Sequence, residues 1–187
     1  MEKVKLDKQA FIYPMPMIIV GAEVAKKPNY MAVAWVTPVG FNPMMFAVAL
    51  GRSHDTNKGI REHGEFSISI PGQDLLQATD HIGLVSGADV DKSRLFETFY
   101  GELKHAPMIK ECPLNMEFRM FKIVDLLNSD LFIGELVSVW CGEKFLTDGK
   151  PDIEKIAPFT VSIPDNRYWA VGQCIGKAWN TGKSFTR

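Results

Sequence analysis

The sequence is short of several features that would assign it at once to a function class. It has three cysteines, Cys112, Cys141 and Cys174, and no CxxC pair, so neither a zinc ribbon, an iron–sulfur cluster nor a thioredoxin-type dithiol is indicated. It also has no Rossmann or P-loop glycine pattern. The four histidines lack metal-ligand spacing, and no Ser/His/Asp constellation occurs. We therefore expect no metal site and no catalytic side chain.

A charge excess of either sign is lacking as well. The 21 basic and 22 acidic residues give a formal net charge of −1, which offers no electrostatic footprint for nucleic acid or an anionic membrane. Apolar runs such as Met15–Val20 and Leu131–Ile133 are too short to cross a bilayer. Met1–Gln9 is charged throughout, unlike a signal peptide. We expect a cytoplasmic protein that binds neither nucleic acid nor membrane.

What the chain does contain is β-rich patterning. Its 187 residues, 46% of them hydrophobic, suit one domain over 1–187, and no repeat or linker divides it. Alternation and turn residues predict strands at 17–24, 31–37, 44–50, 66–70, 114–125, 131–141 and 167–172. Turns are expected at 26–29 and 38–43, short helices between 55 and 99, and a surface segment over 103–116. The fold class is mainly β: a small closed antiparallel barrel of six or seven strands with short helical insertions. A β-sandwich is the alternative.

The chain is most informative between Gly51 and Lys58, where a strand ends and a helix is expected to start. Backbone N–H groups at a helix N-terminus have no intrahelical partners, and the helix dipole favours negative charge there. The basic and hydroxyl side chains that follow Gly51 would add to a phosphate cradle at this end. The alternative is an ordinary helix cap by Ser53 or Asp55, with the basic side chains in water.

Several stretches, in order along the chain, resemble the flavin-reductase-like FMN-binding split-barrel proteins. They are 29–37, 49–56, 65–71, 83–92, 132–137 and 168–176, and they extend the resemblance over about nine tenths of the chain. Within the family, the similarity is greatest to the flavoredoxin and ferric-reductase-like branch.

The resemblance implies a homodimer with FMN bound non-covalently near the subunit interface. Ala34, Trp35, Val36 and Thr37 would lie along the isoalloxazine and ribityl chain. The phosphate would be held by Arg52, Ser53, His54, Thr56 and Lys58. Ser86, Gly87 and Lys92 would close the other side of the flavin, and the remaining pocket residues would be Leu50, Gly51, Asn57 and His81. Trp35 either stacks on the flavin or belongs to the core, and His81 is either a pocket residue or structural.

Three functions follow as hypotheses. The first is an FMN-dependent oxidoreductase that passes electrons from NAD(P)H or a redox protein to free flavin, ferric iron or a protein. The second is a flavoredoxin-type electron carrier that does not oxidise NAD(P)H directly. The third is a barrel without a redox role that binds another phosphorylated ligand. With no Rossmann fingerprint, any nicotinamide nucleotide would bind transiently over the flavin, whose ring carries the chemistry.

Overall fold

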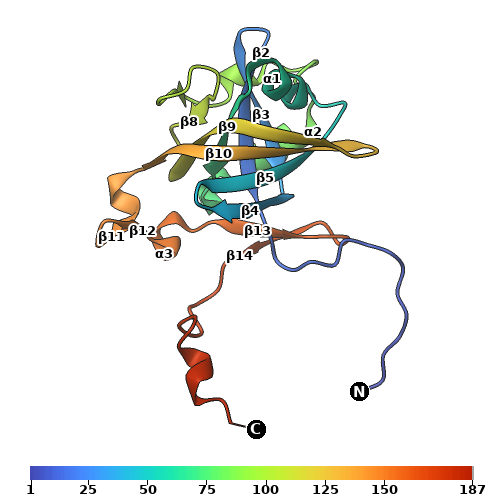
Figure 1. Cartoon of the computed structure of the whole chain (residues 1–187), viewed down its shortest axis with the longest axis vertical. Helices are drawn as coiled ribbons and strands as arrows, with labels where there is room; N and C mark the ends of the chain where they lie inside the picture. The colour runs from blue at the N-terminus through green and yellow to red at the C-terminus, as the bar shows by residue number, and fades with distance from the viewer. Residues whose placement is uncertain (187) are drawn as a thin grey trace.

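A seven-stranded antiparallel sheet is the main feature of the computed structural model, which describes residues 1–186 (Figure 1). Its strand order is β3-β2-β6-β9-β10-β5-β4. The bounds are β2 Ile18–Val24, β3 Lys27–Val33, β4 Val36–Phe41, β5 Met44–Gly51, β6 Glu65–Ile70, β9 Leu114–Asp125 and β10 Ser129–Cys141. Figure 1 shows β2 and β3 running across the direction of β9 and β10, so the sheet is strongly curled.

The two edge strands of this sheet, β3 and β4, are consecutive in the chain. Only Ala34 and Trp35 separate them. Within residues 1–186 no β-ladder joins β3 to β4. The mainly β fold class is therefore confirmed, whereas closure of the barrel stays a prediction.

Smaller elements surround the sheet. A second sheet has the order β1-β13-β14, with bounds Met15–Pro16, Phe159–Ser162 and Arg167–Ala170. Two short ladders join β7 (Thr98–Phe99) to β8 (Met108–Ile109), and β11 (Leu146–Thr147) to β12 (Lys150–Pro151). The helices are α1 Asp55–His63, α2 Leu76–Leu84 and α3 Ile153–Ile156, with 3-10 turns at Gln73–Leu75, Lys92–Arg94, Glu143–Phe145 and Thr181–Ser184.

The hydrophobic core lies inside the curled sheet. Fully buried side chains from six elements meet there, namely Val20, Val48, Leu50, Ile60, Phe66, Ile68, Phe118 and Phe132. The Phe66 and Phe118 rings stack at a centroid distance of 5.1 Å. Ile60 is the contribution of α1 to this core, so the core fixes the position of α1 on the sheet.

Strand β6 differs from the half-buried strand that its alternation predicts. Phe66 and Ile68 enter the core, but Ser67 and Ser69 are also buried, at 0% and 1% exposure. The Ser67 hydroxyl donates to the Pro107 carbonyl, and the Ser69 hydroxyl to Asn115 Oδ1 at 2.6 Å. The segment 103–116, predicted to wrap the surface, covers this second face and is itself largely buried.

The structure differs from the prediction in three segments between residues 25 and 99. The turn expected at 26–29 lies at Ala25 and Lys26, both with positive φ, so β3 starts at Lys27. The loop expected at 38–43 is mostly β4. Pro38 fits there because β4 is an edge strand, where a missing N–H need not interrupt the sheet. The last part of the 55–99 region, where short helices were expected, is only a 3-10 turn at Lys92–Arg94 followed by β7.

Candidate functional site

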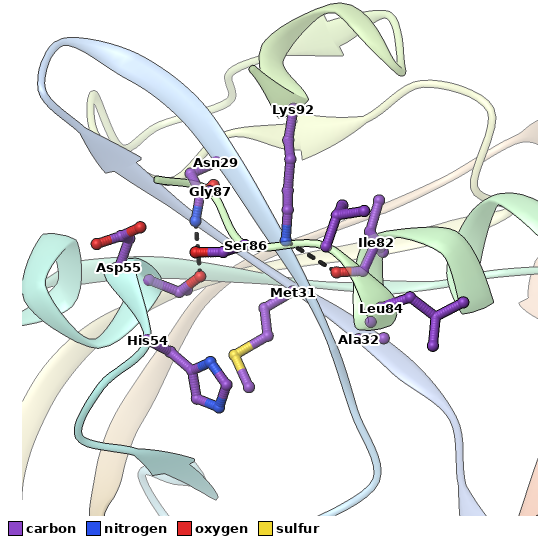
Figure 2. A pocket seen from close by; sticks show the side chains of 13 residues that line it. Asn29, Met31, Ala32, His54, Asp55, Ile82, Leu84, Ser86, Gly87 and Lys92 are labelled. Atoms are coloured by element: carbon purple, nitrogen blue, oxygen red, sulfur yellow. Dashed lines mark hydrogen bonds between the residues drawn. The ribbon is translucent and has the colours of Figure 1, made fainter. Parts of the chain in front are cut away.

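A cleft of about 240 Å³ lies beside the N-terminal end of α1, and we call it the helix-end cleft (Figure 2). One wall is β3, the second is the start of α1, and the third is the end of α2 with the loop after it. The lining residues are Asn29, Met31, Ala32, His54, Asp55, Thr56, Ile82, Gly83, Leu84, Val85, Ser86, Gly87 and Lys92. Segments more than 60 residues apart in the sequence therefore form one pocket.

The helix that borders this cleft starts without a side-chain cap. His54 occupies the N-cap in an extended conformation, but its side chain accepts no cap hydrogen bond. The His54 N–H donates to the Gly51 carbonyl, which closes the turn between β5 and α1. A side chain at Gly51 would put its Cβ 2.9 Å from the His54 ring. Because no side chain within residues 1–186 caps the helix, the N–H groups of Asp55 and Thr56 stay available to an anion, whereas the Asn57 N–H already donates to the His54 carbonyl at 3.1 Å.

Lys92 is the buried cation of the helix-end cleft, with 5% of its surface exposed. Its ammonium donates to the backbone carbonyl of Ile82 at 2.8 Å (Figure 2) and to that of Tyr30 at 3.1 Å. Burial lowers the pKa of Lys92, and the nearby Asp55 carboxylate acts in the opposite direction. Within residues 1–186 no carboxylate forms an ion pair with it, so its charge is not cancelled by direct contact.

Asp55 is the acidic residue of the same cleft. Its side chain is only 13% exposed, and a carboxylate there opposes anion binding. Lys58, one turn further along α1, contacts it with Nζ to Oδ1 at 2.7 Å. The exposed Lys58 offsets part of the Asp55 charge, and Lys92 and the helix end add positive potential to the cleft.

A buried hydrogen bond joins the β3 wall of the cleft to the α1 wall. Asn29 Nδ2 donates to Thr56 Oγ1 at 2.8 Å and so links β3 to the first turn of α1 (Figure 2). Gly87 packs directly against Asn29, since a Cβ at Gly87 would lie 2.5 Å from Asn29 Oδ1. The backbone of the 86–87 loop can approach this wall only because residue 87 is glycine.

Arg52 is turned toward the turn end of the β9–β10 hairpin. Its Nε contacts Asp130 Oδ1 at 3.0 Å, and Arg61 contacts Asp130 Oδ2 at 2.8 Å. Asn57 Nδ2 also donates to Asp130, at 2.9 Å. Burial raises the pKa of the Asp130 carboxyl, but hydrogen bonds from Arg61 and Asn57 outweigh this effect and lower the pKa overall. The Arg52 side chain is still 48% exposed, and this ion pair occupies part of its donor set.

A second, larger and more apolar cleft of about 540 Å³ lies further along the same strands, and we call it the Trp35 cleft. It is lined by the chain between β3 and β4, the middle of β5, Leu131 and the N-terminal arm. The lining residues are Ala10, Ile12, Pro14, Met15, Pro16, Ala34, Trp35, Val36, Thr37, Ala47, Ala49 and Leu131. The Trp35 carbonyl accepts the Ala49 N–H at 3.0 Å, and the Trp35 side chain is 51% exposed, so it does not belong to the buried core.

The residues proposed from the sequence fall into three groups. The helix-end cleft contains His54, Thr56, Ser86, Gly87 and Lys92, and the Trp35 cleft contains Ala34, Trp35, Val36 and Thr37. Leu50, Gly51 and Asn57 lie behind the start of α1, where Leu50 and Asn57 are buried. Neither cleft is lined by Arg52, Ser53 or Lys58, which are exposed beside the helix end, or by His81, which is exposed on α2.

Sequence reasoning missed the β3 and α2 walls, which are formed by Met31, Ala32, Ile82 and Leu84. These residues read as ordinary apolar strand and helix positions, and only the packing of α2 on β3 brings them to the cleft. A cluster of Glu23, His63 and His105 was missed too, because 40 or more residues separate its members. Among residues 1–186, no helix has the length and hydropathy to span a membrane.

Comparison with known proteins agrees with the resemblance carried by the sequence motifs. Residues 10–151 match the family model described as a flavin reductase like domain. The chain belongs to this family. A relative from Archaeoglobus fulgidus is 39% identical over 147 residues, which are 76% of this chain and 81% of that protein.

Two solved structures resemble nearly the whole chain. Flavoredoxin from Methanosarcina acetivorans is 48% identical with a TM-score of 0.96, and the match covers 98% of this chain and 99% of that one. Flavoredoxin of Desulfovibrio vulgaris (Miyazaki F) is 33% identical with a TM-score of 0.91, covering 97% and 100%. An FMN-binding protein from Thermus thermophilus, 21% identical with a TM-score of 0.77 over 91% and 95%, supports the fold alone.

Proposed function

We propose that this flavin-reductase-family protein binds FMN across its two clefts and transfers electrons through it. The observation that carries the proposal is the position of the clefts along the chain. The same two stretches, 29–37 and 47–56, contribute to both clefts. Residues within 29–32 and 54–56 line the helix-end cleft, and Ala34–Thr37, Ala47 and Ala49 line the Trp35 cleft. A polar pocket beside a helix N-terminus, continued by an apolar one, suits a ligand with a phosphate and a flat ring.

The residues present fit this cofactor. First-turn N–H groups of α1 and the hydroxyls of Ser53 and Thr56 would donate to the phosphate, with positive charge from Lys92 and Arg52 nearby. Ala34–Thr37 would lie along the ring and ribityl chain, with the exposed indole of Trp35 as the aromatic surface. The 86–87 loop would close the far side. Bound FMN supplies the electron transfer, and the chain binds, orients and shields it.

We propose that the protein works as a homodimer with the flavin near the interface. Support comes from exposed apolar residues: Trp35 and Ile12, which line the Trp35 cleft, are 51% and 76% exposed, and Phe41, at the end of β4, is 90% exposed. A second copy covering this face would remove them from water. Light scattering at micromolar concentration should give about twice the chain mass of 21.0 kDa; a monomer would contradict this part of the proposal.

Two electron routes remain to be distinguished. A reductase takes electrons from NAD(P)H bound transiently over the flavin and gives them to free flavin, ferric iron or a protein. A carrier of the flavoredoxin type exchanges electrons only with protein partners. The second route has specific support in the similarity to two flavoredoxins over nearly the whole chain. The first has the support of the family model, a flavin reductase like domain.

An absorption spectrum of the purified protein, repeated anaerobically with NADH and then NADPH, tests both parts. Flavin bands, present on purification or restored by added FMN, are expected. Bleaching within seconds would assign the protein as a reductase, and persistence of the bands as a carrier. A protein that stays colourless after incubation with FMN would contradict the proposal and favour a barrel without a redox role.

The Arg52→Ala variant tests the phosphate position. Loss of a charge-assisted bond should weaken FMN binding by about ten- to a hundredfold. Because Arg52 also pairs with Asp130, Asp125→Asn serves as the control: it removes an exposed carboxylate from the same ion-pair network without removing a phosphate donor. Equal FMN affinity in Arg52→Ala and wild type would place the phosphate elsewhere.

A further inference from the structure

Three ionisable side chains converge at the C-terminal end of α1, the opposite end of the helix from the proposed phosphate site. Glu23 comes from β2, His63 is the last residue of α1, and His105 lies in the loop between β7 and β8. One ligand atom from each lies within 4.8 Å of the other two. The side chains of Glu23, His63 and His105 are 18%, 17% and 36% exposed, so the cluster is sheltered but reachable from solvent.

The separations between these atoms suit a common metal ion. Glu23 Oε1 lies 3.7 Å from His63 Nε2 and 3.2 Å from His105 Nδ1. Two ligands bound tetrahedrally to zinc at their usual bond lengths are about 3.3 Å apart. The two imidazole rings stack at a centroid distance of 4.1 Å and an angle of 9°, so their in-plane lone pairs run nearly parallel, and one ring must turn about χ2 to direct its nitrogen at a shared ion.

His105 Nδ1 supplies an independent observation. The atom is buried and makes no hydrogen bond, although Glu23 Oε1 is only 3.2 Å away. The carboxylate is thus near enough but not aligned with the ring nitrogen. Buried polar atoms without a partner are rare and require an explanation. A ligand between the nitrogen and the carboxylate oxygen would satisfy both atoms.

The loop that carries His105 is held in place by its backbone. The His105 N–H donates to Glu65 Oε2 at 2.9 Å, and its carbonyl accepts the Glu23 N–H at 3.2 Å. His63 is also held, because α1 ends at Gly64, whose N–H returns to the Ile60 carbonyl. Because the backbone at both histidines is already ordered, binding requires rotation of a side chain but no rearrangement of the chain, which reduces its entropic cost.

We propose that Glu23, His63 and His105 bind a divalent transition-metal ion, with water completing its coordination. Two imidazoles and one carboxylate are a ligand set of zinc sites and of non-haem iron(II) sites. The ion would fasten the end of α1 to β2 and to the 103–107 loop. It is separate from the flavin and takes no part in the proposed electron transfer.

Tag-free protein, stripped with a chelator and desalted, can be titrated with Zn²⁺ by calorimetry and with Co²⁺ by visible absorption. The expected result is one ion per chain and a Co²⁺ spectrum with nitrogen ligation. At a hundredfold excess over its Kd, Zn²⁺ should raise Tm by about 5–10 °C. Anaerobic Fe²⁺ distinguishes an iron site from a zinc site. Mg²⁺, which prefers oxygen ligands, should bind at least tenfold more weakly.

The variants His63→Ala and His105→Ala should each lose at least tenfold in Zn²⁺ affinity, and Glu23→Gln, nearly isosteric, tests the carboxylate without opening a cavity. His81→Ala is the matched control, since His81 is exposed on α2 and is not a member of the cluster, and it should bind Zn²⁺ like wild type. Circular dichroism establishes that each variant is folded. Equal Zn²⁺ affinity in wild type and Glu23→Gln, no one-to-one binding, or Mg²⁺ binding as tight as Zn²⁺ would overturn the proposal. These measurements need no flavin, so they are independent of the proposed function.

Discussion

The two ends of α1 offer two different chemistries built in two different ways. At its start, residues 51–58 follow one another in the sequence, and backbone N–H groups with nearby cations favour an anion. At its end, His63 meets Glu23 and His105, which come from distant segments and favour a cation. A local motif can be recognised in a sequence, whereas a site assembled from separate elements becomes visible only in the fold.

Asp130 links the start of α1 to the β9–β10 hairpin through ion pairs and a hydrogen bond. Removing its charge should give the largest loss of stability. Asp130→Asn removes a carboxylate that is 2% exposed and contacts Arg52, Arg61 and Asn57. Chemical denaturation should show a loss of about 2–3 kcal/mol in the free energy of unfolding. Asp125→Asn touches the same arginines from a side chain that is 67% exposed and should cost less than about 1 kcal/mol. Similar losses in both variants would contradict the role given to burial.

The same carboxylate predicts a pH dependence. Because the folded protein lowers the pKa of Asp130 below its ordinary value of 3.8, its contribution to stability is present above that value and is lost as pH falls through the folded pKa. The stability difference between wild type and Asp130→Asn should be constant from about pH 7 to pH 5 and shrink below about pH 4. Denaturation curves across this range measure it, and a difference that grows on acidification would refute the sign.

Gly59, in the middle of α1, packs closely against β2, and a substitution there tests how close the helix lies to the sheet. A Cβ at Gly59 would lie 2.3 Å from the backbone carbonyl oxygen of Glu23. Gly59→Ala should therefore destabilise the fold by about 1–3 kcal/mol. A helix with free space at this position would instead gain up to about 1 kcal/mol.

Gly83→Ala in α2 is the matched control for this substitution. Its Cβ would meet only Ala32 Cβ at 3.4 Å, an ordinary contact, so its stability should stay equal or rise. A neutral Gly59→Ala variant in thermal unfolding would mean that α1 sits further from β2 than the structure has it.

The smallest effect is expected at Lys58, in the first turn of α1. Its ion pair with Asp55 is an i,i+3 contact, and the Lys58 side chain is 66% exposed. Lys58→Ala should change the free energy of unfolding by no more than about 0.5 kcal/mol, and less at high salt. A larger, salt-independent loss in paired denaturation curves would show that Lys58 has a structural partner other than Asp55.

The sequence predicted much of the sheet because its long strands alternate clearly. The predicted strand at 114–125 has the bounds of β9, and that at 131–141 differs from β10 only at its start. Prediction failed where tertiary contacts override local signals. Pro38 looks like a turn residue until β4 is known to be an edge strand, and Ser67 looks solvent-facing until the 103–116 segment covers it.

The lining of the two clefts was predictable from the sequence only in part. Thr56, Lys92 and the 34–37 segment, which the motifs singled out, line the two clefts, and their contact with FMN stays a prediction. The orientation of Arg52 depends on Asp130, which is 78 residues away, and no local pattern encodes that contact. The Glu23, His63 and His105 cluster has no sequence signature for the same reason.

The most direct test of the account compares the equilibrium affinities of the flavin-free protein for FMN and for riboflavin, which differ only in the phosphate. If the start of α1 and its cations hold that phosphate, FMN should bind about a hundredfold more tightly or better, because more than one charge-assisted hydrogen bond is lost with riboflavin. Equal affinity for the two flavins would contradict the assignment of the helix-end cleft as the phosphate site.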